Sequence, residues 1–210
     1  MRKGLLPLVL GVALTTTFGI VACRAEPPGD FGAPEAMAPT APAAALPSVP
    51  ISDGRPPTEA AADAPSRLEV PALKLSATVD AVGIDEKTGD FAVPPSVDRV
   101  GWYRFGPGFA ATAGSIVVAG HVDSAAEGKG AFFRLGSLED GDEITLAGPG
   151  GKTRTFRVTA RERYRKTAIP LGKYFVRDGA VRLTLITCGG PFDPRTRHYR
   201  DNVVVTATEK

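Results

Sequence analysis

The chain has 210 residues and carries 25 Lys and Arg against 23 Asp and Glu, which gives a formal net charge of +2. This weak charge, without basic runs that alternate with aromatic residues, argues against a nucleic-acid-binding protein. The two cysteines and two histidines form no group with zinc-site spacing, and there is no phosphate-binding loop or dinucleotide fingerprint. We therefore expect no nucleic-acid partner, no metal and no cofactor.

The first 23 residues combine a basic start with an apolar run over residues 5–22, which is the order of a secretory signal. The run ends in Ile20-Val21-Ala22-Cys23, which resembles the lipobox of bacterial lipoproteins and implies lipidation of Cys23 after cleavage. About 18 apolar residues could instead form an uncleaved membrane anchor, and full secretion is a third possibility. A lipid or an anchor would tether the chain at the extracytoplasmic face of the cell membrane.

Residues 24–66 differ in composition from the rest of the chain. They hold ten prolines and many alanines but few aliphatic residues. Such a segment cannot bury enough apolar surface to offset the entropy of ordering it, so we predict a disordered linker. The remaining residues, 67–210, are sufficient for one folded domain with its own core.

Short β-type runs separated by Gly- and Pro-rich turns fill residues 67–210. The expected strands are residues 67–70, 77–84, 100–105, 115–122, 143–147, 153–164, 180–187 and 202–206. The run 115–122 is almost entirely apolar, which predicts a strand buried on both faces. Only residues 131–137 favour a helix. The pattern predicts an all-β fold, a closed eight-stranded barrel with antiparallel or mixed pairing and one or two short helices, although a sandwich also fits.

Cys188 and His121 each end an apolar run, so a sheet could bring them together. Cys188 has no evident disulfide partner in its own domain, and a free thiol in an exported protein is commonly a catalytic nucleophile. An imidazole beside the thiol would increase the reactive thiolate fraction. Both residues also have plain structural interpretations, as an inert cysteine and as a histidine bonded to a carbonyl. His198 lies in a charged stretch and is interpreted as a surface residue.

Attack of a thiolate on an amide also requires a group that stabilises the oxyanion, and arginine is well suited to this. Arg195, Arg197 and Arg200 all follow Cys188 in the sequence. If residues 200–206 form one strand, alternation places Arg200 and Asn202 on the same face. Each arginine could equally be a solvated surface charge.

Residues 184–188, with the sequence TLITC, resemble the TLxTC signature of sortases, the cysteine transpeptidases of Gram-positive cell surfaces. Residues 118–121 (VAGH) are similar to the histidine strand of that family, and residues 132–142 are similar to the segment that follows it. GGPFD at 189–193 and YRDNVVV at 199–205 look most like class F sortases. The resemblance covers residues 67–210, which would form the catalytic domain.

The resemblance implies a sortase-type barrel with a Cys-His-Arg site. Cys188 would be the nucleophile, and His121 would pair with the thiolate and protonate the leaving amine. Counting back from the last strand puts Asn202 near the usual arginine position. Arg200, two residues earlier on the same face, is therefore our first choice for the arginine, and Arg197 is the second.

The resemblance also implies a substrate and partners. The enzyme would cleave an LPxTG-like sorting signal of a surface protein between Thr and Gly and join the acyl group to an amine, such as a peptidoglycan precursor, with some hydrolysis as a side activity. Residues expected to contact the signal are Thr187, Ile169, Pro170 and Leu171. Two alternative functions are a sortase-fold peptidase that releases its product to water and a non-catalytic barrel lipoprotein that binds wall or peptide ligands.

Overall fold

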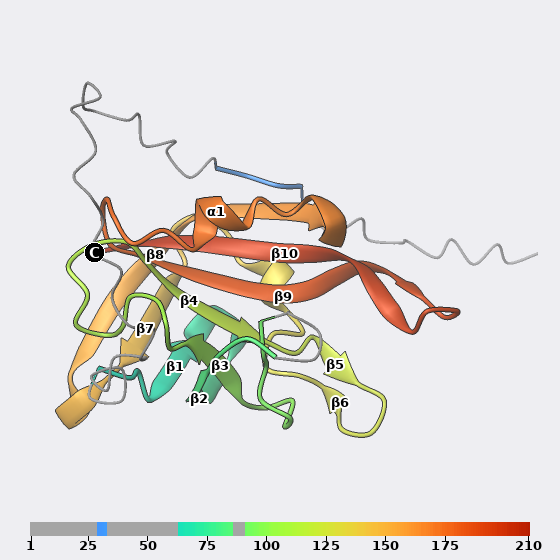
Figure 1. The fold of residues 1–210 in the computed structure, drawn as a ribbon, viewed down its shortest axis with the longest axis horizontal. Helices are drawn as coiled ribbons and strands as arrows, with labels where there is room; N and C mark the ends of the chain where they lie inside the picture. Colours follow the sequence, from blue (N-terminus) through green and yellow to red (C-terminus); the bar gives the residue numbers. More distant parts are fainter. Residues whose placement is uncertain (1–28, 33–62, 86–90) are drawn as a thin grey trace, which may run out of the picture.

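The computed structural model describes residues 29–32, 63–85 and 91–210 (Figure 1). The predicted signal or anchor, including Cys23, and most of the predicted linker lie outside these residues. Within the described residues no helix has the length and apolar character that crossing a bilayer requires.

Eight strands close into a barrel in the order β1-β2-β3-β4-β9-β10-β8-β7 (Figure 1). They are β1 (Arg67–Val70), β2 (Leu75–Val82), β3 (Val100–Tyr103), β4 (Ser115–Gly120), β7 (Glu143–Ala147), β8 (Thr153–Arg165), β9 (Arg182–Asp193) and β10 (His198–Glu209). The β2–β3 and β4–β9 pairs are parallel and the other pairs are antiparallel. The predicted closed eight-stranded barrel with mixed pairing is therefore confirmed.

The remaining described elements are short. They are the ribbon strands β5 (Asp123–Ser124) and β6 (Gly128–Lys129), the 3-10 turns η2 (Pro71–Leu73), η3 (Leu135–Ser137), η4 (Pro149–Gly151) and η5 (Lys166–Ala168), and helix α1 (Leu171–Tyr174). The helix predicted over residues 131–137 is reduced to η3. Here the Phe132 N–H donates to the His121 carbonyl, and Phe132 and Leu135 insert fully into the core. These tertiary contacts fix the segment in an irregular path.

The core lies inside the barrel and is built from residues that alternate along the strands. In β1, Leu68 and Val70 are fully buried while their neighbours are exposed, whereas every residue of β4 is buried. Trp102 is the largest fully buried residue, and its indole N–H donates to the Pro107 carbonyl at 2.9 Å. Ser115 and Thr184, on the parallel strands β4 and β9, share a buried hydroxyl hydrogen bond of 2.7 Å. Apolar burial therefore stabilises the barrel, and its buried polar groups are largely paired.

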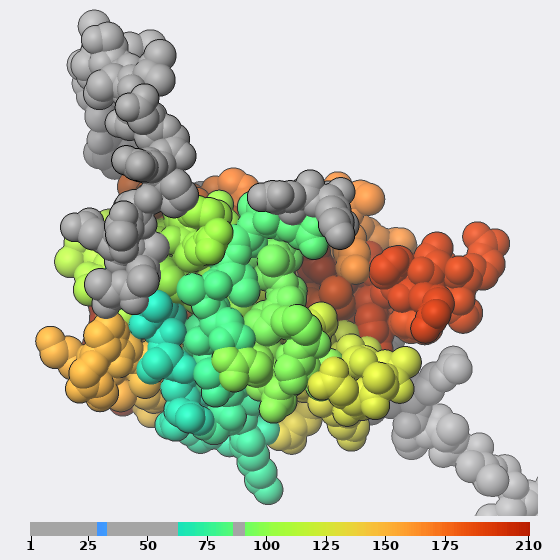
Figure 2. Space-filling view, turned by 60° about the horizontal axis from the view of Figure 1, so that its bottom comes forward, coloured from blue at the N-terminus to red at the C-terminus, as the bar shows by residue number. Residues whose placement is uncertain are grey.

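Strands β9 and β10 extend well beyond their predicted ends and form a long hairpin. Figure 2 shows the hairpin in red, projecting from the body of the barrel above the ribbon that follows β4. The sequence prediction ended β9 near Thr187 because Gly189, Gly190 and Pro191 normally mark a turn. In the hairpin Gly190 instead adopts a left-handed φ of 73°, and the carboxylate of Asp201 occupies the space where a β-carbon would lie.

Two short stretches of the predicted linker lie against the barrel. The backbone of Phe31 pairs with that of Arg161, on the edge of β8 that continues past the end of β7. The Arg161 guanidinium lies 4.6 Å from the Phe31 ring centroid and donates to the Gly29 carbonyl at 2.5 Å. Farther along, the Asp63 carbonyl accepts the Phe109 N–H at 2.9 Å. The barrel therefore binds the chain at two points before β1.

Candidate functional site

Cys188 and His121 come together because β4 and β9 are adjacent parallel strands. Ala119 pairs with Ile186, and continuing this register by two residues places His121 alongside Cys188. Since parallel strands present the same ends to the same edge, both side chains lie where the strands leave the barrel wall. Strand alternation directs Leu185 into the core and Cys188 to the outer face of the sheet. Within the described residues Cys188 is a half-buried free thiol.

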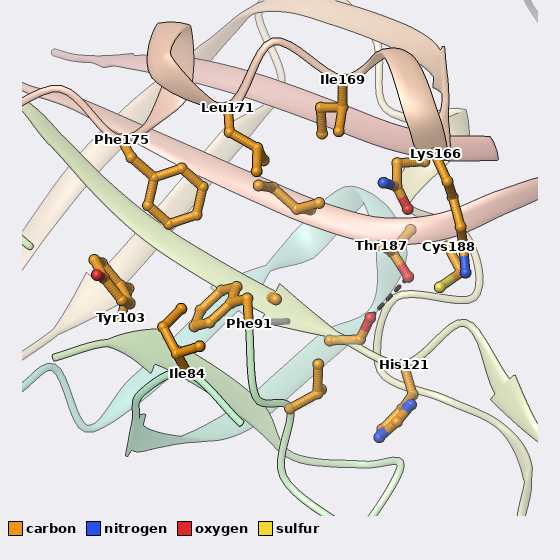
Figure 3. A pocket seen from close by; sticks show the side chains of 15 residues that line it. Ile84, Phe91, Tyr103, His121, Lys166, Ile169, Leu171, Phe175, Thr187 and Cys188 are labelled. Atoms are coloured by element: carbon orange, nitrogen blue, oxygen red, sulfur yellow. Dashed lines mark hydrogen bonds between the residues drawn. The ribbon is translucent and has the colours of Figure 1, made fainter. Parts of the chain in front are cut away.

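A cavity of about 620 Å³ covers this outer face, and both Cys188 and His121 line it (Figure 3). The wall away from the thiol is apolar and aromatic. Phe91, Tyr103 and Phe175 contact one another edge-to-face, with ring centroids 5.2–5.9 Å apart. The site therefore consists of an apolar groove that ends at a thiol and an imidazole.

The hydrogen bonds around the thiol fix the strands on which the site is built. Thr187 directs its hydroxyl into the barrel, where it donates to the Gly120 carbonyl at 2.8 Å and joins β9 to β4 (Figure 3). His121 Nε2 lies 2.9 Å from the Pro94 carbonyl oxygen. Because a carbonyl can only accept, Nε2 carries the proton in this contact and Nδ1 is the acceptor of the neutral ring. The Pro94 carbonyl thus sets both the tautomer and the orientation of the imidazole.

The long hairpin is joined to the histidine loop by one hydrogen bond. The Tyr199 hydroxyl donates to the Asp123 carboxylate at 2.5 Å. This bond, with burial and the nearby charges of Asp123 and Cys188, raises the pKa of Tyr199 to about 12. Tyr199 also contacts Phe192 edge-to-face, with the centroids 5.2 Å apart. These contacts therefore connect β10 to the loop that follows His121.

The predicted arginines do not line the cavity. Arg200 is exposed and extends along the hairpin, where it pairs with the Asp193 carboxylate at 3.5 Å. Arg197 lies in the hairpin turn with a left-handed φ of 58°. A register shift between Tyr199 and Asp201 interrupts the alternation on which the choice of Arg200 depended. Asn202 is the residue directly opposite Cys188 on β10, and it lines the cavity.

The sequence prediction missed one cation at this site. Lys166, the first residue after β8, lines the same cavity as Cys188 and His121. Figure 3 shows its side chain extending from the chain above the sheet toward Cys188. Among the described residues that line the cavity, Lys166 is the only lysine or arginine. A lysine that begins a loop looks like an ordinary surface residue, so the sequence gives no signal for this position.

The predicted substrate-binding loop lies over the cavity. Ile169 and Leu171 line it, together with Thr187, whereas Pro170 does not. The loop is held by Glu162 of β8, which accepts hydrogen bonds from the hydroxyls of Tyr164 and Tyr174, both at 2.8 Å, and from Lys173 at 3.0 Å.

This hydrogen-bond network also controls the charge of its members. Burial raises the pKa of Glu162, but the hydrogen bonds from its three donors outweigh burial and hold that pKa below the ordinary value. Burial and the bonds to Tyr164 and Glu162 raise the pKa of Tyr174. A charged carboxylate therefore fixes α1 over the groove. In the described part of the chain, no three His, Cys, Asp or Glu side chains are grouped to hold a metal ion.

Comparison with known proteins identifies the architecture. The Sortase domain family model matches residues 68–210. Similar solved structures include sortase C2 of Group B Streptococcus Pilus Island 1, with a TM-score of 0.52 at 14% identity over 69% of this chain and 73% of that one. Sortase A from Corynebacterium diphtheriae gives a TM-score of 0.53 at 17% identity over 70% of this chain and 60% of that one. At such identities the structural likeness concerns the fold. No curated protein matches the chain.

Proposed function

Because the chain belongs to the sortase family, we propose that it is a class F-like cysteine transpeptidase that cleaves an LPxTG-like sorting signal between Thr and Gly. The observation that carries this proposal is the placement of a half-buried free thiol, Cys188, at the end of an apolar groove and beside His121. A binding module would need only the groove. A thiol on β9 and an imidazole just after the end of the adjacent strand β4 are the two groups that covalent acyl transfer requires.

In the proposed reaction the Cys188 thiolate attacks the threonine carbonyl carbon, and a C–S bond forms while the carbonyl electron pair moves to oxygen. Collapse of this intermediate breaks the C–N bond, and His121, in its protonated form, gives a proton to the leaving amine. The resulting thioester on Cys188 is then attacked by an acceptor amine, such as one of a peptidoglycan precursor. Water in place of the amine would give hydrolysis as a side reaction.

The shape of the groove supports an apolar peptide with its scissile bond at one end. Phe91, Tyr103 and Phe175 form an aromatic wall on the side away from the thiol, and Leu171 covers the groove from α1. The Leu-Pro part of a sorting signal would lie against this wall. The threonine carbonyl would then lie between Cys188 and the polar end of the site.

The proposed location is the extracytoplasmic face of the cell membrane, where both sorting-signal proteins and the amine acceptor would be partners. Support comes from the signal-like start and the lipobox-like residues that end at Cys23, with an uncleaved anchor as the alternative. Palmitate labelling that is lost in Cys23→Ser would establish lipidation, and unlabelled parent protein would exclude it.

A fluorogenic LPxTG-type peptide, with and without an amine acceptor, tests the proposal. We expect wild-type protein to cleave the peptide and to form the amine adduct, and Cys188→Ala to do neither. Cleavage with no adduct at any amine concentration would identify a peptidase. Peptide binding without cleavage would identify a binding module, and cleavage that survives in Cys188→Ala would refute the mechanism.

A further inference from the structure

The described part of the site has a nucleophile and an imidazole, but the terminal strand provides no cation. Asn202 lies opposite Cys188, and Arg200 is paired with Asp193 away from the cavity. Attack on a carbonyl carbon nevertheless places negative charge on the carbonyl oxygen, and a site without donors for that oxygen is slow. Asn202 can donate an amide N–H to that oxygen but carries no charge, so a cationic donor would have to come from another element that borders the cavity.

We propose that Lys166 is this donor, a catalytic residue whose ammonium binds the oxyanion formed when Cys188 attacks a carbonyl. This inference rests on the proposed acyl transfer by Cys188. In the part of the cavity lining that the structure describes, Lys166 is the only lysine or arginine, and its side chain extends toward Cys188 (Figure 3). No ion pair engages Lys166 within the described residues, whereas its neighbours Arg165 and Lys173 pair with Asp201 and Glu162.

The sheet register places Lys166 at a suitable distance. Cys188, Asn202 and Tyr164 form one row across β9, β10 and β8, and Lys166 follows Tyr164 by two residues, directly after the last paired residue of β8. Two strand spacings separate the α-carbons of Cys188 and Tyr164 by about 10 Å. A lysine ammonium reaches roughly 6 Å from its α-carbon on a four-carbon stem. The extended Lys166 side chain therefore brings its ammonium toward a carbonyl oxygen placed next to the thiol (Figure 3).

In this step the Cys188 sulfur forms a bond to the carbonyl carbon, and the carbonyl electron pair moves to oxygen. An N–H of the Lys166 ammonium donates to that oxygen without transferring its proton. The electron pair returns when the leaving group departs, so Lys166 is unchanged at the end. Lys166 therefore accelerates reactions at carbonyl carbon and has no role in displacement at a saturated carbon.

Two small electrophiles distinguish attack at a carbonyl carbon from displacement at a saturated carbon, and neither requires a sorting-signal peptide. p-Nitrophenyl acetate acylates a thiol through an oxyanion and releases p-nitrophenolate, whereas iodoacetamide alkylates a thiol by displacing iodide. Both products would be quantified on the Cys188 peptide of the full chain by mass spectrometry, which also keeps Cys23 out of the measurement. We expect Lys166→Met to slow acylation by about 100- to 1,000-fold and to change alkylation by less than about twofold.

Lys166→Arg should recover most of the acylation rate, because it restores a cationic donor. Arg165→Met removes the positive charge of the preceding residue and is the matched control, which should leave both rates unchanged. Equal losses of acylation and alkylation in Lys166→Met would overturn the proposal, because they would show an effect on the thiol alone. Unchanged acylation would overturn it as well, as would a loss found only in Arg200→Met. If the ester acylates Cys188 but no sorting-signal peptide is cleaved, the proposed function fails while the role of Lys166 is still decided.

Discussion

Replacing Glu162 by Gln tests whether one carboxylate holds the groove loop in place. The Glu162 carboxylate accepts hydrogen bonds from Tyr164, Tyr174 and Lys173 at 2.8–3.0 Å. Glutamine keeps the shape of the side chain but removes the charge and replaces one acceptor oxygen by an amide N–H₂, which cannot accept the hydrogen bonds that this oxygen receives. The substitution therefore breaks at least one bond and weakens the others.

The size of the effect follows from the burial of the pair. The Glu162 side chain is 17% exposed and that of Lys173 is 33% exposed, so solvent screens the interaction only partly. A hydrogen bond to a charged group contributes about 1.5–3 kcal/mol, and one such bond is lost while a second is weakened. We expect unfolding free energy to fall by about 2–3 kcal/mol at pH 7, and Tm by about 6–9 °C for a domain of this size.

The pH dependence of this loss is diagnostic. The folded-state pKa of Glu162 lies below its ordinary value, so its stabilisation is present above the ordinary glutamate pKa of about 4.3 and is lost as the pH falls through the folded-state pKa. Urea unfolding of wild type and Glu162→Gln between pH 7 and pH 3.5 should therefore converge at low pH. Glu143→Gln, which removes an exposed paired carboxylate, is the matched control and should change little. A wild-type to Glu162→Gln difference that is absent at pH 7, or undiminished at pH 3.5, would refute this reasoning.

Three further substitutions test other contacts. Thr187→Val removes the buried hydrogen bond to the Gly120 carbonyl and should lower unfolding free energy by about 1–2 kcal/mol in urea titrations; an unchanged midpoint would show that β4 and β9 do not need it. Gly32→Ala places a β-carbon against the Thr159 carbonyl at a left-handed φ of 66°, so limited proteolysis should cut near residue 32 faster than in Gly29→Ala, where the space is open; equal rates would contradict the docking of this segment. Tyr199→Phe removes the hydrogen bond to Asp123. Because the pKa of Tyr199 is raised to about 12, the difference in unfolding free energy between wild type and variant should be full below pH 10 and vanish as the pH rises to about 12. A difference that persists at pH 12 would argue against this bond.

Local patterns predicted the barrel because strands buried on one face have alternating apolar residues and strands buried on both faces have continuous apolar runs. Strand β1 and strand β7 begin and end at the predicted residues, and β4 is as fully buried as its apolar run indicated. The hairpin formed by β9 and β10 could not be predicted in the same way. Its residues beyond Thr187 are stabilised by pairing with each other across the hairpin, and this cross-strand pairing has no local signature.

In the candidate site, too, some residues could be predicted from local sequence patterns and others could not. Cys188 and His121 could be found because each ends an apolar run in the sequence, and the parallel pairing of β4 with β9 brings these two runs side by side. The predicted arginine depended on counting residues along one uninterrupted strand, and the register shift near Tyr199 breaks that count. Lys166 reaches the cavity from β8, two strands away from Cys188 in the sheet. Its position relative to Cys188 depends on the tertiary fold, which the local sequence around Lys166 does not predict.

The contact between residues 29–32 and β8 has a consequence for how high above a membrane the enzyme would stand. Six peptide steps separate Cys23 from Gly29, and a fully extended chain spans about 20 Å over that length. With Gly29 bound by Arg161, a lipid on Cys23 would restrain the β8 side of the barrel to a shallow layer above the bilayer, however long the linker that follows. The distance of Cys188 from the membrane would then be limited by the short segment between Cys23 and Gly29. Substrates would therefore have to present their cleavage site close to the lipid headgroups.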